Sequence, residues 1–426
     1  MELKILFLGT KNFIQNKKLM IKNIQIGVIG LGYVGLPVSM AFAERYRVIG
    51  YDLDKDKIKR LNKKIDFNGE FSKKDFNNKH IFFSNKINDL NNCNVYVVAV
   101  PTPIFANKKP NLNPLKKAMI SLSKILKKGD FVVLESTVTP GTSENYCIPI
   151  LEKSGLKINK DFYFCFSPER INPADKKHTF KNINKVISCS SKKKIGFIKN
   201  IYSNIISAKI HVASSLKVAE ASKIIENVQR DINISFINYI TKLFAKEEIN
   251  VHEVLEASAT KWNFLNFKPG LVGGHCIGVD PYYLIELEKK KISNSLITLS
   301  RKINESMVNF YFNKIILEIS KKNLKNPKVL FLGVSFKENV PDLRNSKYLE
   351  LYNKLQKRIK NLFLYDPLCN FNNLQKKNLN FYDLKIKKNN FEVVIIAVQH
   401  NSLMKILKKN QAHKKKFYLI KLKNLF

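Results

Sequence analysis

The chain has 426 residues, a formal net charge of +40 and 45% hydrophobic residues. This length fits two or three globular domains and is long for one. Only eight of the 74 basic residues are arginine, and the lysines are spread from end to end, which argues against a nucleic-acid binder with arginine gathered on one face. The charge would still attract a phosphate-bearing substrate at long range.

Cysteine and hydropathy patterns narrow the class further. The six cysteines contain no Cys-x-x-Cys pair and no zinc spacing, which favours free thiols in a reducing cytoplasm and indicates no metal site. No apolar run reaches the length of a membrane-spanning helix and no signal peptide is evident, so we expect a cytoplasmic protein with neither membrane nor nucleic acid as partner. Residues 1–20 are expected to be a disordered extension or to precede the native start at Met20.

The first predicted unit is a dinucleotide site. A β-branched run, residues 24–29, leads into a turn with Gly30, Gly32 and Gly35, and a helix and a second strand follow. The glycines permit a tight turn, close approach of a pyrophosphate and close helix–strand packing, with the pyrophosphate at the positive end of the helix. The second strand ends at Asp52, which would bind a ribose 2′-hydroxyl and repel a 2′-phosphate, so NAD is favoured over NADP.

Three further polar residues are candidates for this site. Lys57 lies five residues beyond the acid and either reaches the adenosine ribose or is one more solvated lysine. Thr102 and Thr137 each follow an apolar strand, at the edge where open α/β sheets bind ligands, although threonine is common at strand ends. Strands that alternate with helical stretches predict a parallel sheet with helices on both faces.

An irregular loop follows another apolar strand. It runs from Phe166 to Pro173 and carries Glu169 and Arg170 between two prolines. An acid and an arginine in such a loop suit a general base and an anion contact. A surface ion pair is the alternative interpretation.

A long helix is predicted from about Ser215 to Leu255, and polar residues at steps of three and four share one of its faces. These residues are Glu220, Lys223, Asn227 and Arg230. Such a stripe can be a solvated face. The apolar residues between them, such as Ile224, Ile225 and Val228, favour a buried helix, in which a lysine beside an asparagine can stabilise a developing alkoxide.

Cys276 stands in a glycine-rich loop, residues 270–283, four residues before Asp280. Glycines on both sides let the backbone approach a ligand closely. A thiol in so open a loop favours a nucleophile over a structural cysteine, although buried free cysteine is common. A thiol nucleophile and a hydride acceptor in one chain suggest an oxidation that passes through a covalent sulfur adduct.

The strand pattern returns near the C-terminus, after a helix at about 293–321. Strands are predicted at 328–332, 362–365 and 392–398, which indicates a second, smaller α/β domain. The predicted fold class is therefore α/β, with two Rossmann-like doubly wound domains joined by a long central helix. Lys337 and Arg344 follow the first strand of the last domain and suit a second phosphate-bearing ligand.

Seven segments in this order resemble the UDP-glucose/GDP-mannose dehydrogenase family. They are Gly30–Pro37, Val100–Pro103, Glu135–Gly141, Ser167–Pro173, Ala219–Asn233, Lys261–Leu284 and Phe336–Ser346. The resemblance covers roughly residues 22–400 and is closest to the branch that oxidises UDP-N-acetylhexosamines at C6, as in capsule, Vi-antigen and O-antigen biosynthesis. It implies an NAD-binding domain (21–212), a central helical dimerisation region with the cysteine loop (213–321) and a C-terminal nucleotide-sugar-binding domain (322–426).

The resemblance also implies a mechanism. The C6 alcohol would be oxidised to an aldehyde, Cys276 would add to it as a thiohemiacetal, a second oxidation would leave a thioester, and water would release the uronic acid. NAD would receive the hydride in both oxidations. Lys223 and Asn227 match residues that stabilise the oxyanion, and Glu169 matches a residue proposed to activate water.

Further positions follow from the same resemblance. Thr137 and Asp280 match positions that order the water. The implied NAD contacts are Gly30, Gly32, Val34, Gly35, Asp52, Lys57, Thr102, Thr137 and Arg344. The implied nucleotide-sugar contacts are Arg170, Ile171, Lys223, Asn227, Arg230, Gly273, His275 and Lys337.

Departures from the family pattern bear on the substrate. Pro173 stands where UDP-glucose dehydrogenases usually have a second acid, Ala174 replaces a usual glycine, and Tyr239 replaces a typical glutamate. The proline favours a UDP-GlcNAc or UDP-GalNAc 6-dehydrogenase for surface polysaccharide biosynthesis, acting as a homodimer or higher homo-oligomer, over the alternative, a UDP-glucose 6-dehydrogenase. Two alternatives from other classes remain. One is a lysine-rich nucleic-acid binder that kept a dehydrogenase fold, which would form no NADH. The other is an inactive homologue, and the intact set of catalytic residues argues against it.

Overall fold

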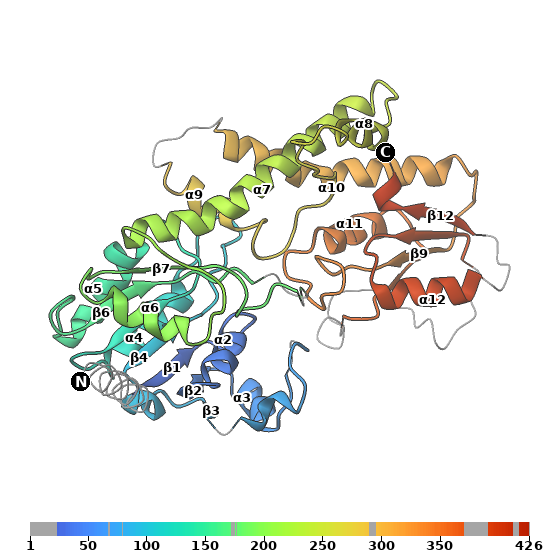
Figure 1. The fold of residues 1–426 in the computed structure, drawn as a ribbon. Coiled ribbons are helices and arrows are strands. Elements are labelled where there is room, and N and C mark those ends of the chain that lie inside the picture. Colours follow the sequence, from blue (N-terminus) through green and yellow to red (C-terminus); the bar gives the residue numbers. More distant parts are fainter. Residues whose placement is uncertain are drawn as a thin grey trace, which may run out of the picture. The chain divides into compact units, whose positions relative to one another are not determined.

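The computed structural model describes residues 24–66, 69–78, 80–171, 175, 177–288, 295–369, 391–411 and 417–425 (Figure 1). The expected N-terminal extension, residues 1–20, lies outside these residues, as do Pro173 and Ala174. The chain divides into two compact units, Met1–Ile225 and Glu226–Phe426.

The first unit is built on one large sheet with the strand order β3-β2-β1-β4-β5-β6-β7-β8. Neighbouring strands are parallel except β6 and β7, which run antiparallel, so the predicted parallel sheet reverses direction near its end. The strands are β1 (Gln25–Ile29), β2 (Arg47–Tyr51), β3 (Ile81–Ser84), β4 (Val95–Val98), β5 (Phe131–Leu134), β6 (Tyr163–Phe166), β7 (Lys185–Cys189) and β8 (Ile210–Val212). The helices are α2 (Gly35–Phe42), α3 (Lys55–Asn62), α4 (Asn113–Ser123), α5 (Ile148–Leu151) and α6 (Ile195–Ser203).

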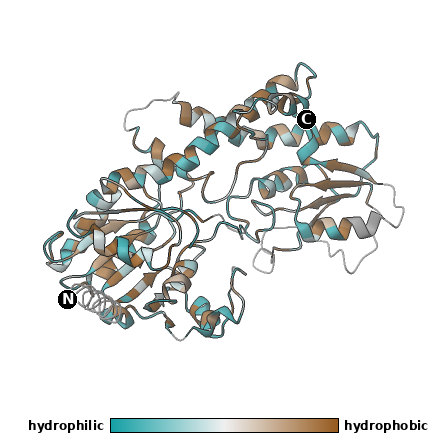
Figure 2. Ribbon diagram, viewed as in Figure 1, coloured by the Kyte–Doolittle hydropathy of each residue, from teal (hydrophilic) through white to brown (hydrophobic). Residues whose placement is uncertain are grey.

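Helices cover both faces of this sheet because side chains alternate along each strand. Val28 on β1 packs in one apolar cluster with residues of α2 and α6. Its neighbour Ile29 packs in another cluster with residues of α4 and α5. The strands are hydrophobic along their length (Figure 2), as expected for parallel strands that are buried on both faces.

The strand order reverses between β1 and β4, and this reversal creates a ligand-binding edge. In doubly wound sheets, ligands bind outside the carboxyl ends of the strands at such a switch point. Gly30 follows β1, and Thr102 and Thr137 follow β4 and β5, so all three lie near the carboxyl ends of adjacent strands.

The second unit carries a smaller parallel sheet with the order β10-β9-β11-β12. Residues of α10 and α11 pack in a cluster with Phe331, and Leu403 of α12 packs in the cluster that contains Leu330. The predicted fold class, with two doubly wound α/β sheets, is therefore confirmed. The strands are β9 (Val329–Leu332), β10 (Leu362–Tyr365), β11 (Val393–Ile396) and β12 (Tyr418–Lys421). The helices are α8 (Val251–Ser258), α9 (Asp280–Ile285), α10 (Leu296–Ser320), α11 (Lys347–Gln356) and α12 (Asn401–Gln411).

The long helix α7 (Leu216–Phe244) spans the boundary between the units but is shorter than predicted. Glu248 has a positive φ of 55°, which ends the helical path. The Asn250 side chain then accepts hydrogen bonds from two backbone N–H groups and begins α8. The expected burial holds for Ile224 and Val228, whereas Ile225 is exposed.

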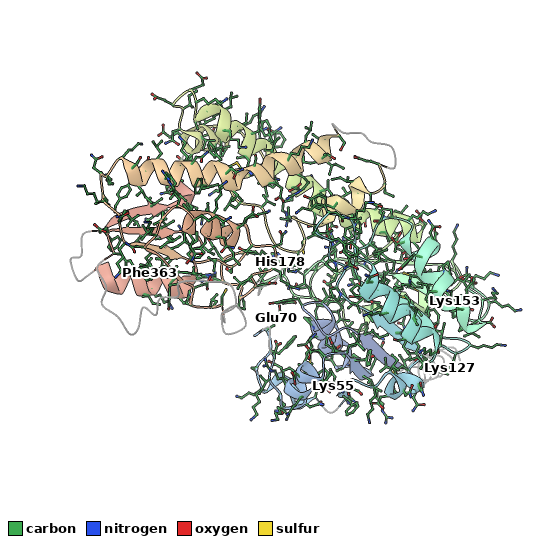
Figure 3. The ribbon with its side chains drawn as sticks, turned by 180° about the vertical axis from the view of Figure 1, so that it is seen from behind. Lys55, Glu70, Lys127, Lys153, His178 and Phe363 are labelled. Atoms are coloured by element: carbon green, nitrogen blue, oxygen red, sulfur yellow. The ribbon has the colours of Figure 1, made fainter. Side chains whose placement is uncertain are left out.

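The described helices include none that is both long and apolar enough to cross a membrane. Three exposed lysines of the first unit come from different segments: Lys55 begins α3, Lys127 lies between α4 and β5, and Lys153 follows α5 (Figure 3).

A buried polar network joins α7 to α10 within the second unit. Nη1 of Arg301 donates to Oδ1 of Asp231 at 2.6 Å, and Nδ2 of Asn304 donates to the same oxygen at 2.8 Å. Asn238 donates to Oδ1 of Asn304 at 2.8 Å and to the Gly270 carbonyl at 3.0 Å. Its Oδ1 also accepts the Gly270 N–H at 2.9 Å, so the network fixes the start of the glycine-rich loop.

Replacing Arg301 with methionine should test how strongly this network stabilises the fold. Arg301→Met leaves the fully buried Asp231 carboxylate without its cation, and we expect the free energy of unfolding to fall by about 3–5 kcal/mol. Lys302→Met removes an exposed charge from the next position and should change it by less than about 0.5 kcal/mol. Urea unfolding followed by circular dichroism compares the two, and equal midpoints would contradict the network's role.

Candidate active site

The glycine turn after β1 is shaped by close packing. Gly30 has a φ of +92°, and a Cβ there would lie 2.9 Å from the Ala99 carbonyl oxygen. A Cβ on Gly35 would lie 1.7 Å from the Gly30 carbonyl oxygen, so neither position tolerates a side chain. A Cβ on Gly32 would meet no atom within 4 Å, which leaves open space beside the start of α2, where Val34 is the N-cap. This arrangement fits a pyrophosphate group.

Asp52 holds both the turn and the helix that follows β2. Its Oδ2 accepts the Leu31 N–H at 2.9 Å and the Lys57 ammonium at 2.7 Å, while Oδ1 accepts the Asp54 N–H at 3.0 Å. The two polar candidates, Asp52 and Lys57, therefore form one partly buried ion pair beside the glycine turn. A ribose hydroxyl would meet this pair rather than an isolated carboxylate.

The two threonines predicted at strand ends come together. The Thr102 hydroxyl donates to the Thr137 carbonyl at 2.7 Å, which links the loops after β4 and β5. The loop after β5 is also pinned from α7, because the buried Glu220 accepts the N–H groups of Gly141 at 2.5 Å and Ser143 at 2.8 Å. Glu220, the first residue of the predicted polar stripe, thus has a structural partner.

Glu169 is buried at the carboxyl end of β6. Its Oε1 accepts the backbone N–H groups of Arg170 at 2.7 Å and Ile171 at 2.9 Å, which folds the loop around the carboxylate. Arg170 does not pair with Glu169 as a surface ion pair would; its guanidinium donates to the Asn184 carbonyl at 2.9 Å.

Sequence reasoning missed the partners of Glu169. Lys185, at the start of β7, donates to Oε2 of Glu169 at 2.7 Å and lies 3.4 Å from Oε1 of Glu135. Tyr202 on α6 donates to the same Glu135 oxygen at 2.5 Å. One lysine among so many gave no signal, although a lysine that opens the apolar run Val186-Ile187 is unusual.

On α7, Lys223 lies one turn before Asn227 and is half-buried. Arg230 follows on the same stripe and is exposed. Asn227 is buried, and its Nδ2 donates to Oδ2 of Asp280 at 2.6 Å. Two residues that the sequence placed 53 positions apart are therefore direct partners in the second unit.

Cys276 is a half-buried cysteine that forms no disulfide, and it lies in a tight turn. Its carbonyl accepts the N–H groups of Val279 at 3.0 Å and Asp280 at 2.8 Å, which leads the chain into α9. Backbone hydrogen bonds therefore fix Cys276 relative to Asp280, and a side-chain hydrogen bond fixes Asp280 relative to Asn227. The other described cysteines are buried except Cys189.

The loop after β9 packs onto the cysteine turn. Asn345 donates through Nδ2 to the Gly274 carbonyl at 2.8 Å and accepts the Gly274 N–H at 3.1 Å. A Cβ on Gly273 would lie 2.5 Å from the Asn345 carbonyl oxygen, which explains a glycine there. Sequence reasoning did not single out Asn345, because a contact across 71 residues leaves no local pattern.

A second charged group lies at this junction. Arg344 holds Asp342 in a bidentate pair, in which Nε lies 3.0 Å from Oδ1 and Nη2 lies 2.6 Å from Oδ2. Burial raises the pKa of Asp342, but the hydrogen bonds and charge of Arg344 outweigh it and hold that pKa below its usual value. His275 lies beside the pair, with Nδ1 3.8 Å from Oδ2 of Asp342, and its ring meets Phe336 edge-on. Lys337 is half-buried in the same loop.

Comparison with known proteins identifies the parts of the chain. Three domains of the UDP-glucose/GDP-mannose dehydrogenase family match it: the NAD binding domain at residues 24–206, the central domain at 217–306 and the UDP binding domain at 330–426. The NAD binding match contains the glycine turn, whose open space at Gly32 and acid at Asp52 fit this cofactor.

Similar proteins match over most of the chain. Protein CapL of Staphylococcus aureus is 43% identical over 90% of this chain and 91% of its own length. The UDP-N-acetyl-D-glucosamine 6-dehydrogenase of Salmonella typhi is 40% identical over 89% and 91%. The structure of a UDP-D-ManNAc dehydrogenase from Pyrococcus horikoshii superposes with a TM-score of 0.83 at 28% identity, covering 95% and 96% of the two chains. The chain therefore belongs to the UDP-glucose/GDP-mannose dehydrogenase family and is an oxidoreductase that uses NAD.

Proposed function

We propose that this protein is a UDP-N-acetylhexosamine 6-dehydrogenase that oxidises the C6 alcohol twice, to the uronic acid, for surface polysaccharide biosynthesis. The observation that carries the proposal is the 40% identity, over 89% of the chain, to an enzyme named for UDP-N-acetyl-D-glucosamine. The thiol of Cys276, which forms no disulfide and lies in a fixed turn, supplies the nucleophile that a double oxidation needs. UDP-glucose is the less supported alternative substrate.

Cys276 carries the covalent part of the proposed mechanism. NAD, when bound, accepts the hydride that each oxidation releases. The thiolate sulfur adds to the C6 aldehyde and forms a thiohemiacetal. After the second oxidation the acyl carbon is a thioester, and attack by water breaks the C–S bond, with its electron pair returning to the sulfur.

Lys223 and Asn227 are proposed to stabilise the oxyanion that forms at the reacting oxygen, by charge and by a hydrogen bond. The Asn227–Asp280 bond supports this assignment, because it orients the amide and leaves a second N–H of Nδ2 for a ligand. Glu169 is proposed to take a proton from the attacking water, with Thr137 and Asp280 ordering that water.

The remaining candidates are proposed as binding residues. The glycine turn with Val34, Asp52, Lys57, Thr102, Thr137 and Arg344 would contact NAD. Arg170, Ile171, Arg230, Gly273, His275 and Lys337 would contact the nucleotide sugar. The domain roles predicted from the sequence, with boundaries at 21–212, 213–321 and 322–426, are proposed with them. Thiols that must stay reduced for catalysis support a cytoplasmic location.

A homodimer is proposed on the basis of apolar surface on α7. Phe236 and Tyr239, 57% and 52% exposed, and Leu243 follow one another at helical spacing on one face. Trp262, 91% exposed, adds a large apolar side chain in the same unit. Apolar residues gathered in this way mark an interface with another protein surface. We propose a second copy of the chain as the partner of this face.

The first experiment is NADH formation by the purified protein with UDP-GlcNAc, UDP-GalNAc or UDP-glucose. We expect two NADH per acetamido sugar consumed, because the sugar stays on the enzyme as a thiohemiacetal between the two oxidations. Two NADH with UDP-glucose only would overturn the substrate assignment and keep the mechanism. No NADH with any of the three would contradict the proposed function.

Cys276→Ser should lose the second oxidation, because a hydroxyl is a far poorer nucleophile than a thiolate. We expect a fall of about 100-fold or more in uronic acid formation, measured by chromatography of the products. Cys147→Ser, at a buried cysteine outside the proposed site, is the matched control and should keep both oxidations.

A contrasting variant separates the roles of the thiol and the oxyanion residues. Lys223→Met should lower the rate of both oxidations while the NAD dissociation constant stays near the wild-type value, since the contact forms in the transition state. The covalent role of Cys276 would be refuted if the Cys276→Ser variant formed free uronic acid at the wild-type rate.

Phe236→Glu with Leu243→Glu should dissociate the dimer, because two charges would be buried at the interface. Sedimentation equilibrium of the wild type should give about twice the chain mass of 49.2 kDa, and that of the double variant the monomer mass. Glu247→Lys, an exposed change beyond the end of α7, is the control. A monomeric wild type would rule out the dimer.

A further inference from the structure

The first unit buries one ammonium group between two carboxyl groups. The side chains of Lys185, Glu169 and Glu135 are 3%, 4% and 0% exposed. Lys185 begins β7, whereas Glu169 and Glu135 follow the neighbouring strands β6 and β5. The ammonium also lies over the rings of Phe180 and Tyr202, at 4.8 and 5.6 Å from their centroids. The cluster is therefore dry, and its charges interact strongly.

The hydrogen bonds show which carboxyl is ionised. Glu169 receives three donors: the N–H groups of Arg170 and Ile171 at one oxygen, and Lys185 at the other. Glu135 receives Tyr202 at Oε1, whereas its Oε2 is buried without a hydrogen-bond partner among the described residues. Charged acceptors favour the position with more donors, so Glu169 carries the negative charge and Glu135 holds a proton.

The electrostatics agree with this distribution. Burial raises the pKa of Glu135 to about 7, against the opposing charge of Lys185. Glu135 therefore stays protonated until the pH rises through about 7. Burial and the neighbouring Glu135 raise the pKa of Tyr202 well above its usual value, so it acts as a neutral donor.

We propose that Lys185 is a positioning residue for the hydrolytic half of the reaction: it holds Glu169 ionised and oriented, and Glu135 is the proton-carrying partner that keeps the buried cluster neutral. The inference rests on the proposed function and deepens it. When water attacks the thioester, its proton moves to Glu169, its oxygen bonds to the acyl carbon, and the C–S bond breaks with its electron pair on the Cys276 sulfur. Without the Lys185 ammonium, the buried Glu169 carboxylate would lose its cation and one of its three donors, and with them the orientation that lets it accept that proton.

The test is Lys185→Met in the full chain, with a UDP-sugar that the wild type oxidises. Rapid quenching and intact-protein mass spectrometry would follow the uronyl thioester on Cys276. We expect hydrolysis to slow by about 10- to 100-fold at pH 7, so that the thioester accumulates, and its pH profile to differ from that of the wild type. NAD affinity should stay unchanged. Lys192→Met, at an exposed lysine just beyond β7, is the matched control and should behave as the wild type.

Glu135→Gln is the second variant, because it keeps the size of the side chain and the acceptor for Tyr202. At pH 7 this variant should hydrolyse the thioester at near the wild-type rate. Any change in the wild-type rate between pH 6 and 8 that is caused by ionisation of Glu135 should be absent from the variant. It tests the cluster independently if Lys185→Met does not fold.

Two results would overturn the inference. One is a pH profile of hydrolysis that neither variant changes. The other is an equal loss of both oxidations at every pH with weaker NAD binding, which a purely structural role for Lys185 would produce. Failure of the proposed function itself would look different, because the wild type would then form no NADH from any UDP-sugar.

Discussion

A carboxylate that leaves water must find donors inside the protein, and this requirement organises the molecule. Burying an unpartnered charge costs several kcal/mol, so a buried carboxylate needs hydrogen-bond donors or a cation beside it. Glu220 accepts hydrogen bonds from the loop after β5, and Asp231 binds Arg301 of α10. Glu169 accepts hydrogen bonds from its own loop and from Lys185. In each case the acid lies beside a segment that carries a candidate catalytic or binding residue.

The second unit also has a buried carboxylate that accepts backbone N–H groups, at the end of a strand of its own sheet. Asp366 follows β10 and accepts the N–H groups of Val334 and Ser335 at 2.8 and 3.2 Å, with His400 as a further buried partner. These bonds fix the start of the loop that holds Asp342 and Asn345. Because Asn345 is bonded to Gly274, the order imposed by Asp366 extends to the cysteine turn.

A parallel sheet brings residues that are far apart in the sequence together at one of its edges. All strands of a parallel set end at one edge, so residues scattered over the chain meet there without long-range pairing signals. Thr102 and Thr137 meet in this way, and Glu135, Glu169 and Lys185 meet because β5, β6 and β7 are neighbours. The reversed direction of β7 is what brings the first residue of that strand, Lys185, to the edge where β5 and β6 end.

The sequence by itself determined the two α/β sheets, the glycine turn and the solitary thiol in its open loop. These features depend on local chemistry: β-branched runs form strands, Gly30 and Gly35 occupy positions where a Cβ would collide with backbone, and glycines on both sides mark the Cys276 turn. Only the tertiary structure decided the partners of Glu169, the Asn227–Asp280 bond, the Asn345 contact and the break between α7 and α8. Each of these contacts joins residues whose spacing carries no periodic signal, or depends on which backbone groups remain unpaired after folding, and neither can be read along the chain.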